Sequence, residues 1–349
     1  MTDKVSRKDV QEYYGRVLKT KDDLKTSACC GAESMAPYIR DILNRIAPEI
    51  LEKFYGCGSP IPPELEGCAV LDLGCGAGRD AYVLSKLVGE HGRVIGIDMT
   101  DEQIAVAQRH RDAQAHTFGF AKSNIEFMKG CIEDLAELGI ASDSIDVVVS
   151  NCVVNLSFDK PKLLREIFRV LKPGGELYFS DVFASRRIPA ELKDDPVLIG
   201  ECIAGAFYIE DFRRALAEAG CPDGRLFSSR EIEVHDSEIR NRIGMTRLYS
   251  RTVRAFKLAS LEDRCEDFGQ HATYLGTIPE EPRCFKLDDH HCLEKGRPML
   301  VCGNTAGMLS ETRFGKHFRV EGDRSVHYGL FDCSPAVTKD GECAGGGCC

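Results

Sequence analysis

Cysteine is the residue type in this chain that most directly suggests chemistry. There are 17 cysteines among 349 residues, and because the number is odd, at least one of them is not in a disulfide within the chain. A chain of this length does not need disulfides to replace a hydrophobic core. So many thiols therefore favour soft-metal binding, redox chemistry or catalysis, although roughly half of them are expected to be small buried side chains without a chemical role.

Four positions bring cysteine close to one expected ligand-binding edge. Cys57 lies in a loop of glycines and prolines before the first expected strand, Cys152 directly follows the fourth strand and Cys202 follows the fifth. Cys29, with Cys30 beside it, lies in the N-terminal segment. Each one alone is more often an inert buried thiol. Together they suit a soft trivalent centre such as arsenic(III), since no histidine or carboxylate is interleaved with them at zinc spacing.

Arsenic(III) held by three thiolates keeps a lone pair that can attack the methyl group of a sulfonium ion in line. No proton blocks this nucleophile, so the protein needs no general base. Its expected contributions are to position the two reactants and to keep the thiols ionised. The cysteines are far apart in the sequence, so the fold must bring them together.

The segment from Asp72 to Gly78 predicts a cofactor-binding loop. Its glycines let the backbone approach a ligand closely, but the spacing is G-x-G-x-G rather than the G-x-G-x-x-G of dinucleotide-binding proteins. Asp72 would repel a pyrophosphate and could receive an ammonium group, which favours S-adenosylmethionine over NAD. Asp98, 26 residues later, could hold two ribose hydroxyls at the end of the second strand. The alternative is a tight turn without a ligand.

Short apolar runs alternate with helical patterns between residues 68 and 181, which predicts a parallel sheet with right-handed crossovers. Because ligands bind at the carboxyl ends of such strands, the glycine-rich loop, Asp98 and Cys152 should meet at one edge. The expected strands are 68–73, 93–98, 125–129, 145–150 and 176–181, and the expected helices are 79–88, 101–115, 161–171 and 209–219.

The expected fold class is α/β: a Rossmann-like, mostly parallel sheet with helices on both faces, plus a smaller C-terminal α+β domain. Helical patterns at 8–18 and 35–54 precede the sheet. We place the parts at 1–60 for an N-terminal helical segment with cysteine loops, 61–228 for the cofactor-binding domain, 229–335 for the C-terminal domain and 336–349 for a disordered Cys-rich tail.

Charge and hydropathy exclude several kinds of partner. The chain has 45 basic and 55 acidic residues and a net charge of -10, which repels nucleic acid and anionic membrane surfaces. No apolar run approaches the roughly 20 residues of a membrane-spanning helix, and the N-terminus has no apolar core of a signal peptide. We therefore expect a cytoplasmic protein that binds neither nucleic acid nor membrane.

The glycine-rich loop and the segment Lys172–Gly175 before the fifth strand resemble class I S-adenosylmethionine-dependent methyltransferases. The resemblance implies that the 61–228 part is the methyltransferase domain. It also implies a set of residues around the cofactor: Asp72, Gly74, Cys75 and Gly76 at the methionine part, Asp98 and Met99 at the ribose and adenine, Ile132 and Glu133 beside the adenine, and Asn151 closing the site.

Six further segments look like the arsenite methyltransferases, and this resemblance extends from about residue 10 to residue 333. They are 25–30, 54–60, 150–156, 200–205, 274–278 and 287–291. The resemblance implies that arsenic is held by Cys152 and Cys202, with Cys57 as third ligand or disulfide partner. It also implies a further redox step at Cys29, with Cys30 as the alternative, and a place beside the cofactor for Tyr55.

Two positions depart from the family pattern. Val154 stands where the fourth-strand motif often has a second cysteine, and Ala204 stands where the segment after Cys202 often has its first glycine. Neither change removes an implied arsenic ligand.

The sequence thus predicts a monomeric arsenite methyltransferase of the detoxification type. S-adenosylmethionine would supply the methyl group, and arsenite, delivered as a glutathione conjugate, would be converted to methyl- and dimethyl-arsenicals, with disulfides reduced by thioredoxin or glutathione. One alternative is a carbon or oxygen methyltransferase for a quinone- or sterol-like acceptor, which would need an apolar pocket and a base. Another is a non-catalytic, thiol-rich metalloid-binding protein, which would have no use for the Asp72 loop.

Overall fold

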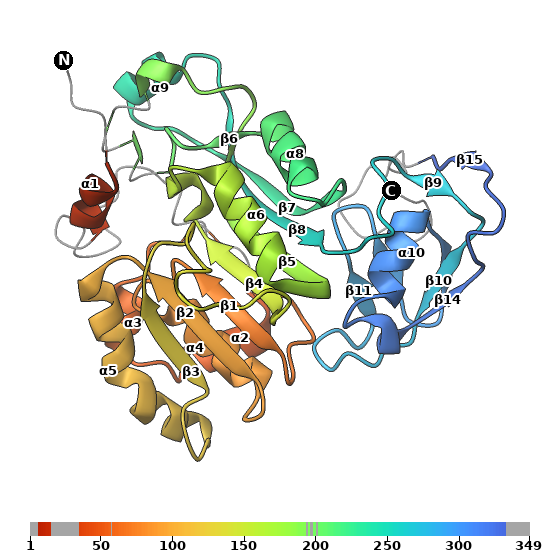
Figure 1. The fold of residues 1–349 in the computed structure, drawn as a ribbon, viewed down its shortest axis with the longest axis horizontal. Helices are drawn as coiled ribbons and strands as arrows, with labels where there is room; N and C mark the ends of the chain where they lie inside the picture. Colours follow the sequence, from red (N-terminus) through yellow and green to blue (C-terminus); the bar gives the residue numbers. More distant parts are fainter. Residues whose placement is uncertain are drawn as a thin grey trace.

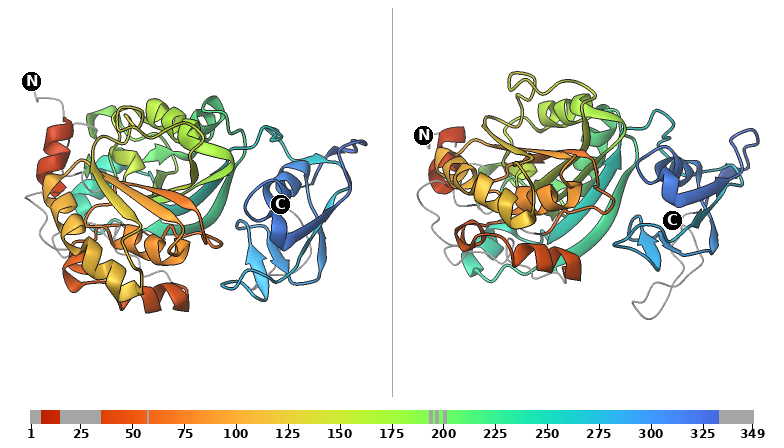
Figure 2. Two further views of the ribbon diagram at one scale, coloured as in Figure 1. Left: turned by 60° about the horizontal axis from the view of Figure 1, so that its bottom comes forward. Right: turned by 90° about the horizontal axis from the view of Figure 1, so that it is seen from below.

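The computed structural model describes residues 6–14, 35–56, 58–192, 195, 198–199 and 202–332. Cys29, Cys30, Cys57 and the expected tail at 336–349 lie outside these ranges. Within them, a large α/β body occupies one end of the molecule and a smaller body the other, as Figures 1 and 2 show. No helix in the described ranges is long and apolar enough to cross a membrane.

The centre of the large body is an eight-stranded sheet in the order β3-β2-β1-β4-β5-β8-β7, with β6 paired to the end of β5. Strands β1 to β5 run parallel, and β8 is antiparallel to both β5 and β7. The predicted mostly parallel sheet is therefore confirmed. The strands are β1 (Ala69–Leu73), β2 (Arg93–Asp98), β3 (Ile125–Lys129), β4 (Ile145–Asn151), β5 (Leu171–Ala184), β6 (Phe207–Tyr208), β7 (Gly224–Ile232) and β8 (Leu248–Phe256).

Helices cover both faces of this sheet (Figure 1). On one face Val70 and Val94 pack with α2 (Pro37–Leu43), α3 (Pro48–Glu52), α4 (Arg79–Val88) and α5 (Asp101–Phe118). On the other face Leu71 and Ile95 pack with α6 (Lys160–Val170) and α8 (Ile209–Glu218). Successive residues of a strand point to opposite faces, which explains why these strands read as continuous apolar runs.

The N-terminal helical pattern is divided differently from the prediction. Instead of one helix over 35–54, α2 ends at Leu43 and α3 begins at Pro48. Proline has no N–H to donate to the preceding turn but fits the first position of a helix, so it starts a new one. Ile46 and Ile50 are buried all the same. The first helix, α1 (Arg7–Glu12), has the rest of its expected length, to residue 18, largely outside the described ranges.

In the described residues the smaller body contains three short sheets, one α-helix and a short 3-10 helix at Gly315–His317. Its strands are β9 (Glu266–Asp267), β10 (His271–Tyr274), β11 (Cys284–Lys286), β12 (Cys292–Glu294), β13 (Pro298–Leu300), β14 (Phe318–Glu321) and β15 (Gly329–Leu330), with helix α10 (Gly303–Ser310). Aromatic rings form its core, including Tyr274, Phe285 and Phe318. The segment at 224–256, including α9 (Ser237–Ile243), adds β7 and β8 to the large sheet, so strands outside that sheet begin only at Glu266.

Buried ion pairs join the two bodies. Glu176 on β5 is fully buried and pairs with Arg254 on β8 and with Arg313 from the smaller body. Removing one member of such a group would leave a buried charge poorly compensated. These contacts therefore fix the smaller body against one end of strands β5 and β8.

A second cluster of buried charged residues joins the two bodies beside β7. Arg225 donates to Asp288 over 2.9 Å, and the Nδ1 atom of His291 lies 2.7 Å from the same carboxyl group. Burial opposes the charge of Asp288, but the hydrogen bond with His291 and the attraction of Arg225 outweigh it and lower its pKa.

Candidate active site

A pocket opens at the carboxyl ends of β1, β2 and β4. The chain order of the strands reverses between β1 and β4, and ligands of open α/β sheets bind at such a switch point. The structure brings all ten expected cofactor residues to this pocket. They are Tyr55, Asp72, Gly74, Cys75, Gly76, Asp98, Met99, Ile132, Glu133 and Asn151.

The glycine-rich loop is held in place by the end of β2. The N–H groups of Gly74 and Cys75 donate to the carbonyl of Ile97, and the N–H of Gly76 donates to Asp98 over 3.0 Å. Gly74 has a φ of 73°, and a Cβ there would lie 2.3 Å from the side chain of Val153. Only glycine fits this position without strain or a clash, so the cofactor loop packs directly against the segment that follows Cys152.

Asp72 makes the floor of the pocket negative. Its side chain is 2% exposed, and its Oδ2 atom has no hydrogen-bond partner among the described residues. Burial raises its pKa well above the usual range, and repulsion by Asp80 and Asp98 raises it further. A cationic ligand would relieve this repulsion and supply a donor for Oδ2. The arrangement suits the ammonium and sulfonium groups of S-adenosylmethionine and not a pyrophosphate.

Asp98 is oriented for a ligand with two hydroxyls. One of its oxygens accepts from the N–H of Gly76 and the other from the N–H of Thr100, at 3.0 and 2.8 Å. Each carboxylate oxygen has a further lone pair, so both can accept from a ribose. Burial raises the pKa of Asp98, while the N–H donors oppose the rise.

Asn151 closes the pocket by joining the loop at Gly58 to the start of α4. Its amide donates to Gly58 over 2.9 Å and to Asp80 over 2.8 Å, and its Oδ1 accepts from the N–H of Gly58. A Cβ at Gly56 would lie 2.5 Å from the same amide. The two glycines that flank Cys57 in sequence therefore both lie against Asn151, the residue before Cys152. Asp80 was not predicted from the sequence, where its only signal is a carboxylate in the first turn after the loop.

The two cysteines expected to hold arsenic share an unusual backbone conformation. Cys152 has a φ of 58° and Cys202 a φ of 60°, and only four non-glycine residues in the described ranges have a positive φ. The left-handed region costs a residue with a side chain roughly 1–2 kcal/mol. Such strain persists where the surrounding fold imposes it, and it is concentrated at functional sites.

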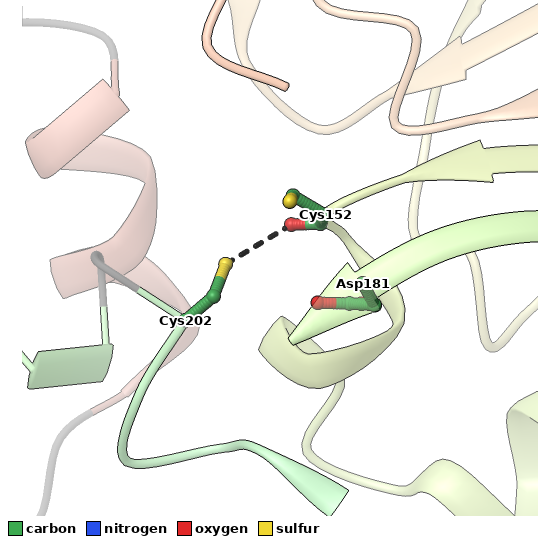
Figure 3. Close-up of side chains that lie close together, drawn as sticks. All are labelled: Cys152, Asp181 and Cys202. Carbon is green, nitrogen blue, oxygen red and sulfur yellow. Dashed lines mark hydrogen bonds between the residues drawn. The ribbon is translucent and has the colours of Figure 1, made fainter. Parts of the chain in front are cut away.

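Cys152 and Cys202 lie side by side although 50 residues separate them. The thiol of Cys202 donates to the carbonyl of Cys152 over 3.2 Å (Figure 3). Both side chains are buried, at 3% and 0% exposure. Gly205 permits this approach, because a Cβ there would lie 2.2 Å from the carbonyl oxygen of Asn155.

The redox states of these two thiols differ. Cys152 is disulfide-bonded, and its partner is none of the nine other cysteines in the described ranges, which are all reduced. Cys202 is one of the reduced thiols. A trivalent arsenic could therefore bind both sulfur atoms only after the disulfide of Cys152 has been reduced.

Asp181 lies beside these thiols and was not predicted as a site residue from the sequence. One of its carboxylate oxygens and the sulfur atoms of Cys152 and Cys202 lie within 4.8 Å of one another, and Figure 3 shows the carboxyl group directed toward the same space as the Cys202 thiol. Burial raises its pKa to about 7, although N–H groups of Asn155 and Val182 oppose the rise. The available signal was its place at the end of the fifth expected strand.

The N-terminal helix covers part of the same pocket. Arg7 lies 3.5 Å from Glu133, and Gln11 donates to the carbonyl of Met99 over 2.9 Å. Gln103 donates weakly to the carbonyl of Tyr14, and its Oε1 atom has no partner among the described residues. Arg7, Tyr14 and Gln103 all line the pocket, and none was predicted from the sequence.

The fold and the pocket together define a class I S-adenosylmethionine-dependent methyltransferase. A family model described as a methyltransferase domain matches residues 64–220. The chain is 52% identical to an arsenite methyltransferase of Aquipseudomonas alcaligenes over 96% of each chain, and 44% identical to one of Mus musculus over 89% of this chain and 82% of that one. The crystal structure of an arsenic(III) S-adenosylmethionine methyltransferase from Chlamydomonas reinhardtii superposes with a TM-score of 0.83 at 50% identity, covering 86% of this chain and 100% of that chain.

The chain belongs to the arsenite methyltransferase family, and it is an S-adenosylmethionine-dependent methyltransferase. The predicted family and fold class are confirmed. The similarity covers nearly the whole chain, including the C-terminal body, so the quinone or sterol methyltransferase and the non-catalytic metalloid-binding protein are not supported.

Proposed function

We propose that the enzyme methylates arsenic(III) held by the sulfur atoms of Cys152 and Cys202, with Cys57 as the third ligand. The observation that carries this proposal is the pair of left-handed cysteines beside the cofactor pocket. Cys152 itself lines the pocket, and Cys202 touches its carbonyl. The fold imposes a strained backbone at these two thiols, which an inert buried cysteine would not require.

The assignment of Cys57 is supported by its neighbours in sequence. Gly56 and Gly58 both contact Asn151, directly before Cys152. Cys57 is bonded to both glycines, so it is one residue along the chain from each of these contacts with Asn151. The same contacts of Gly56 and Gly58 support Cys57 as the disulfide partner of Cys152 in the oxidised enzyme.

S-adenosylmethionine supplies an electrophilic methyl group on a sulfonium centre. Asp72 would bind its ammonium group and Asp98 its ribose, which would fix the donor at the glycine-rich loop. Held there, it would supply its methyl group to the lone pair of arsenic and leave as a neutral thioether. No proton is transferred, so the protein's contribution is alignment of the two centres and a pocket whose carboxylates favour the cation.

Arsenic enters as a glutathione conjugate by exchange of thiols. Each protein thiol that bonds to arsenic releases one glutathione, and the proton of the entering thiol leaves with the departing one. Methyl transfer formally oxidises trivalent arsenic by two electrons. Two thiols that become a disulfide return these electrons, and thioredoxin or glutathione then reduces the disulfide. Cys29, or Cys30 beside it, is our candidate for this redox step.

Arsenic speciation by chromatography with elemental mass detection tests the proposal. Wild-type protein incubated with arsenite, S-adenosylmethionine and glutathione should give methylated arsenic. The Cys152→Ser and Cys202→Ser variants should give none while still binding S-adenosylmethionine by calorimetry. Cys221→Ser is the matched control, since Cys221 is also buried but lies at the far end of α8. Methylated arsenic from either site variant at the wild-type rate would refute the ligand assignment.

A further inference from the structure

We propose that Cys152, Cys202 and Asp181 also form a mononuclear site for divalent cations such as Zn²⁺ and Cd²⁺, which compete with arsenic(III). The proposal shares its two thiols with the proposed arsenic site. Cation binding is measured without S-adenosylmethionine, so a failure of methylation would leave this inference standing. It applies to the reduced protein, in which both sulfur atoms are available.

The three side chains lie close enough together to supply three ligands of a tetrahedral site with one open position. Their ligand atoms lie within 4.8 Å of one another, and all three residues are buried. Zinc binds thiolate sulfur at about 2.3 Å and carboxylate oxygen at about 2.0–2.2 Å, which places such ligands roughly 3.5–4 Å apart. Small side-chain rotations close the remaining difference. Three protein ligands leave the fourth position to water.

The carboxylate of Asp181 is oriented but retains capacity for a ligand. Its Oδ1 atom accepts from the side chain of Asn155 over 2.7 Å and from the N–H of Val182 over 2.8 Å. Among the described residues, its Oδ2 atom accepts from the N–H of Asn155 alone, over 3.0 Å. Such outer hydrogen bonds orient ligating carboxylates, and a lone pair of Oδ2 remains for a cation.

The positive charge of Lys160 attracts the Asp181 carboxylate, but burial opposes its charge more strongly. Two thiolates and one carboxylate would still place three negative charges in a buried space. A dication neutralises most of this charge, and Zn²⁺ and Cd²⁺ accept both sulfur and oxygen ligands. Arsenic(III) takes sulfur ligands and gains little from a carboxylate. Asp181 should consequently strengthen cation binding much more than arsenic binding.

The experiment is a titration of the reduced full-length protein with Cd²⁺. Binding is monitored by the thiolate-to-metal charge-transfer absorption. A phosphine reductant keeps the thiols reduced without chelating the metal. Wild type should bind one more equivalent of Cd²⁺ than Cys202→Ser, and arsenite should displace that equivalent. Cys221→Ser should behave as wild type, which controls for loss of a thiol elsewhere.

The Asp181→Asn variant isolates the carboxylate. Its dissociation constant for the site equivalent of Cd²⁺ should rise at least tenfold, while its dissociation constant for arsenite changes less than threefold. Ser180→Ala, at the adjacent buried position on β5, should leave both constants at the wild-type values.

Two results would overturn the proposal. If Asp181→Asn binds Cd²⁺ as tightly as wild type, the carboxylate is not a ligand. If the variant loses Cd²⁺ and arsenite in the same proportion, Asp181 acts only by holding the fold of the site. In either case the thiols alone would account for binding.

Discussion

The left-handed backbone at Cys202 predicts a stability difference that ordinary buried cysteines should not show. Replacement by alanine removes the sulfur but keeps the Cβ and therefore the strain at φ 60°. Replacement by glycine removes both. The difference between the two variants also includes the loss of a buried methyl group and the greater chain entropy of glycine. Those two contributions favour alanine at any buried site.

Cys221 provides the reference for these common contributions. It is fully buried, is not disulfide-bonded and has a φ outside the left-handed region. At each position we take the free energy of unfolding of the glycine variant minus that of the alanine variant. Subtracting the value at Cys221 from the value at Cys202 leaves the backbone strain, which should favour glycine at Cys202 by roughly 1–2 kcal/mol. For a domain of this size, 1 kcal/mol corresponds to a shift of about 2–4 °C in melting temperature.

The assay is thermal unfolding of the four variants under reducing conditions, which removes any contribution of the Cys152 disulfide. The Cys221→Gly variant should have a lower melting temperature than Cys221→Ala. For Cys202→Gly and Cys202→Ala this order should reverse, or the two melting temperatures should be equal. If glycine is disfavoured equally at both positions, the fold does not impose the left-handed conformation at Cys202. Backbone strain would then no longer identify Cys202 as an arsenic-binding thiol.

Three further predictions address the cofactor and the frame. Asp72→Asn should weaken S-adenosylmethionine roughly 10- to 100-fold in a calorimetric titration, because it removes one charged hydrogen bond; an unchanged affinity would contradict the ammonium assignment. Arg313→Ala should cost about 2–3 kcal/mol in denaturant unfolding, because it leaves Glu176 buried with one partner fewer, whereas Arg297→Ala, in an exposed pair, should cost under about 0.5 kcal/mol. Asp288 has a lowered pKa in the folded protein, so its stabilisation is present above roughly pH 4 and lost below it. Asp288→Asn should therefore destabilise the protein at pH 7, and its difference from wild type should narrow as the pH falls below 4; a constant difference would argue against the ionised pair.

Strand positions near the cofactor could be predicted from the sequence because local pattern and tertiary role coincide there. The expected strands at 93–98 and 125–129 and the helix at 79–88 have the bounds seen in the structure. Buried parallel strands must be short and apolar, and each ends at a turn residue that the sequence displays. In the C-terminal part of the sheet, the local sequence pattern is a weaker guide to strand position. Strand β8 (Leu248–Phe256) pairs antiparallel with β5 over its whole length, a contact between distant segments that no local pattern indicates.

Some residues of the site could likewise be predicted from the sequence, whereas others depend on tertiary contacts. Asp72 and Asp98 lie at the carboxyl ends of β1 and β2, so their convergence could be predicted from the sequence and the rule for parallel sheets. The position of Cys202 beside Cys152 depends on a left-handed residue in each segment and on Gly205 against Asn155, which are tertiary facts. Asp181 shows the limit most clearly. The sequence predicted a strand that ends at Asp181, whereas β5 continues to Ala184, and the carboxylate acquires a role only from two thiols that other loops bring beside it. A buried carboxylate beside two thiols adds a hard oxygen ligand to a site of soft sulfur ligands. The Cd²⁺ titration of Asp181→Asn measures how much this oxygen contributes to cation binding.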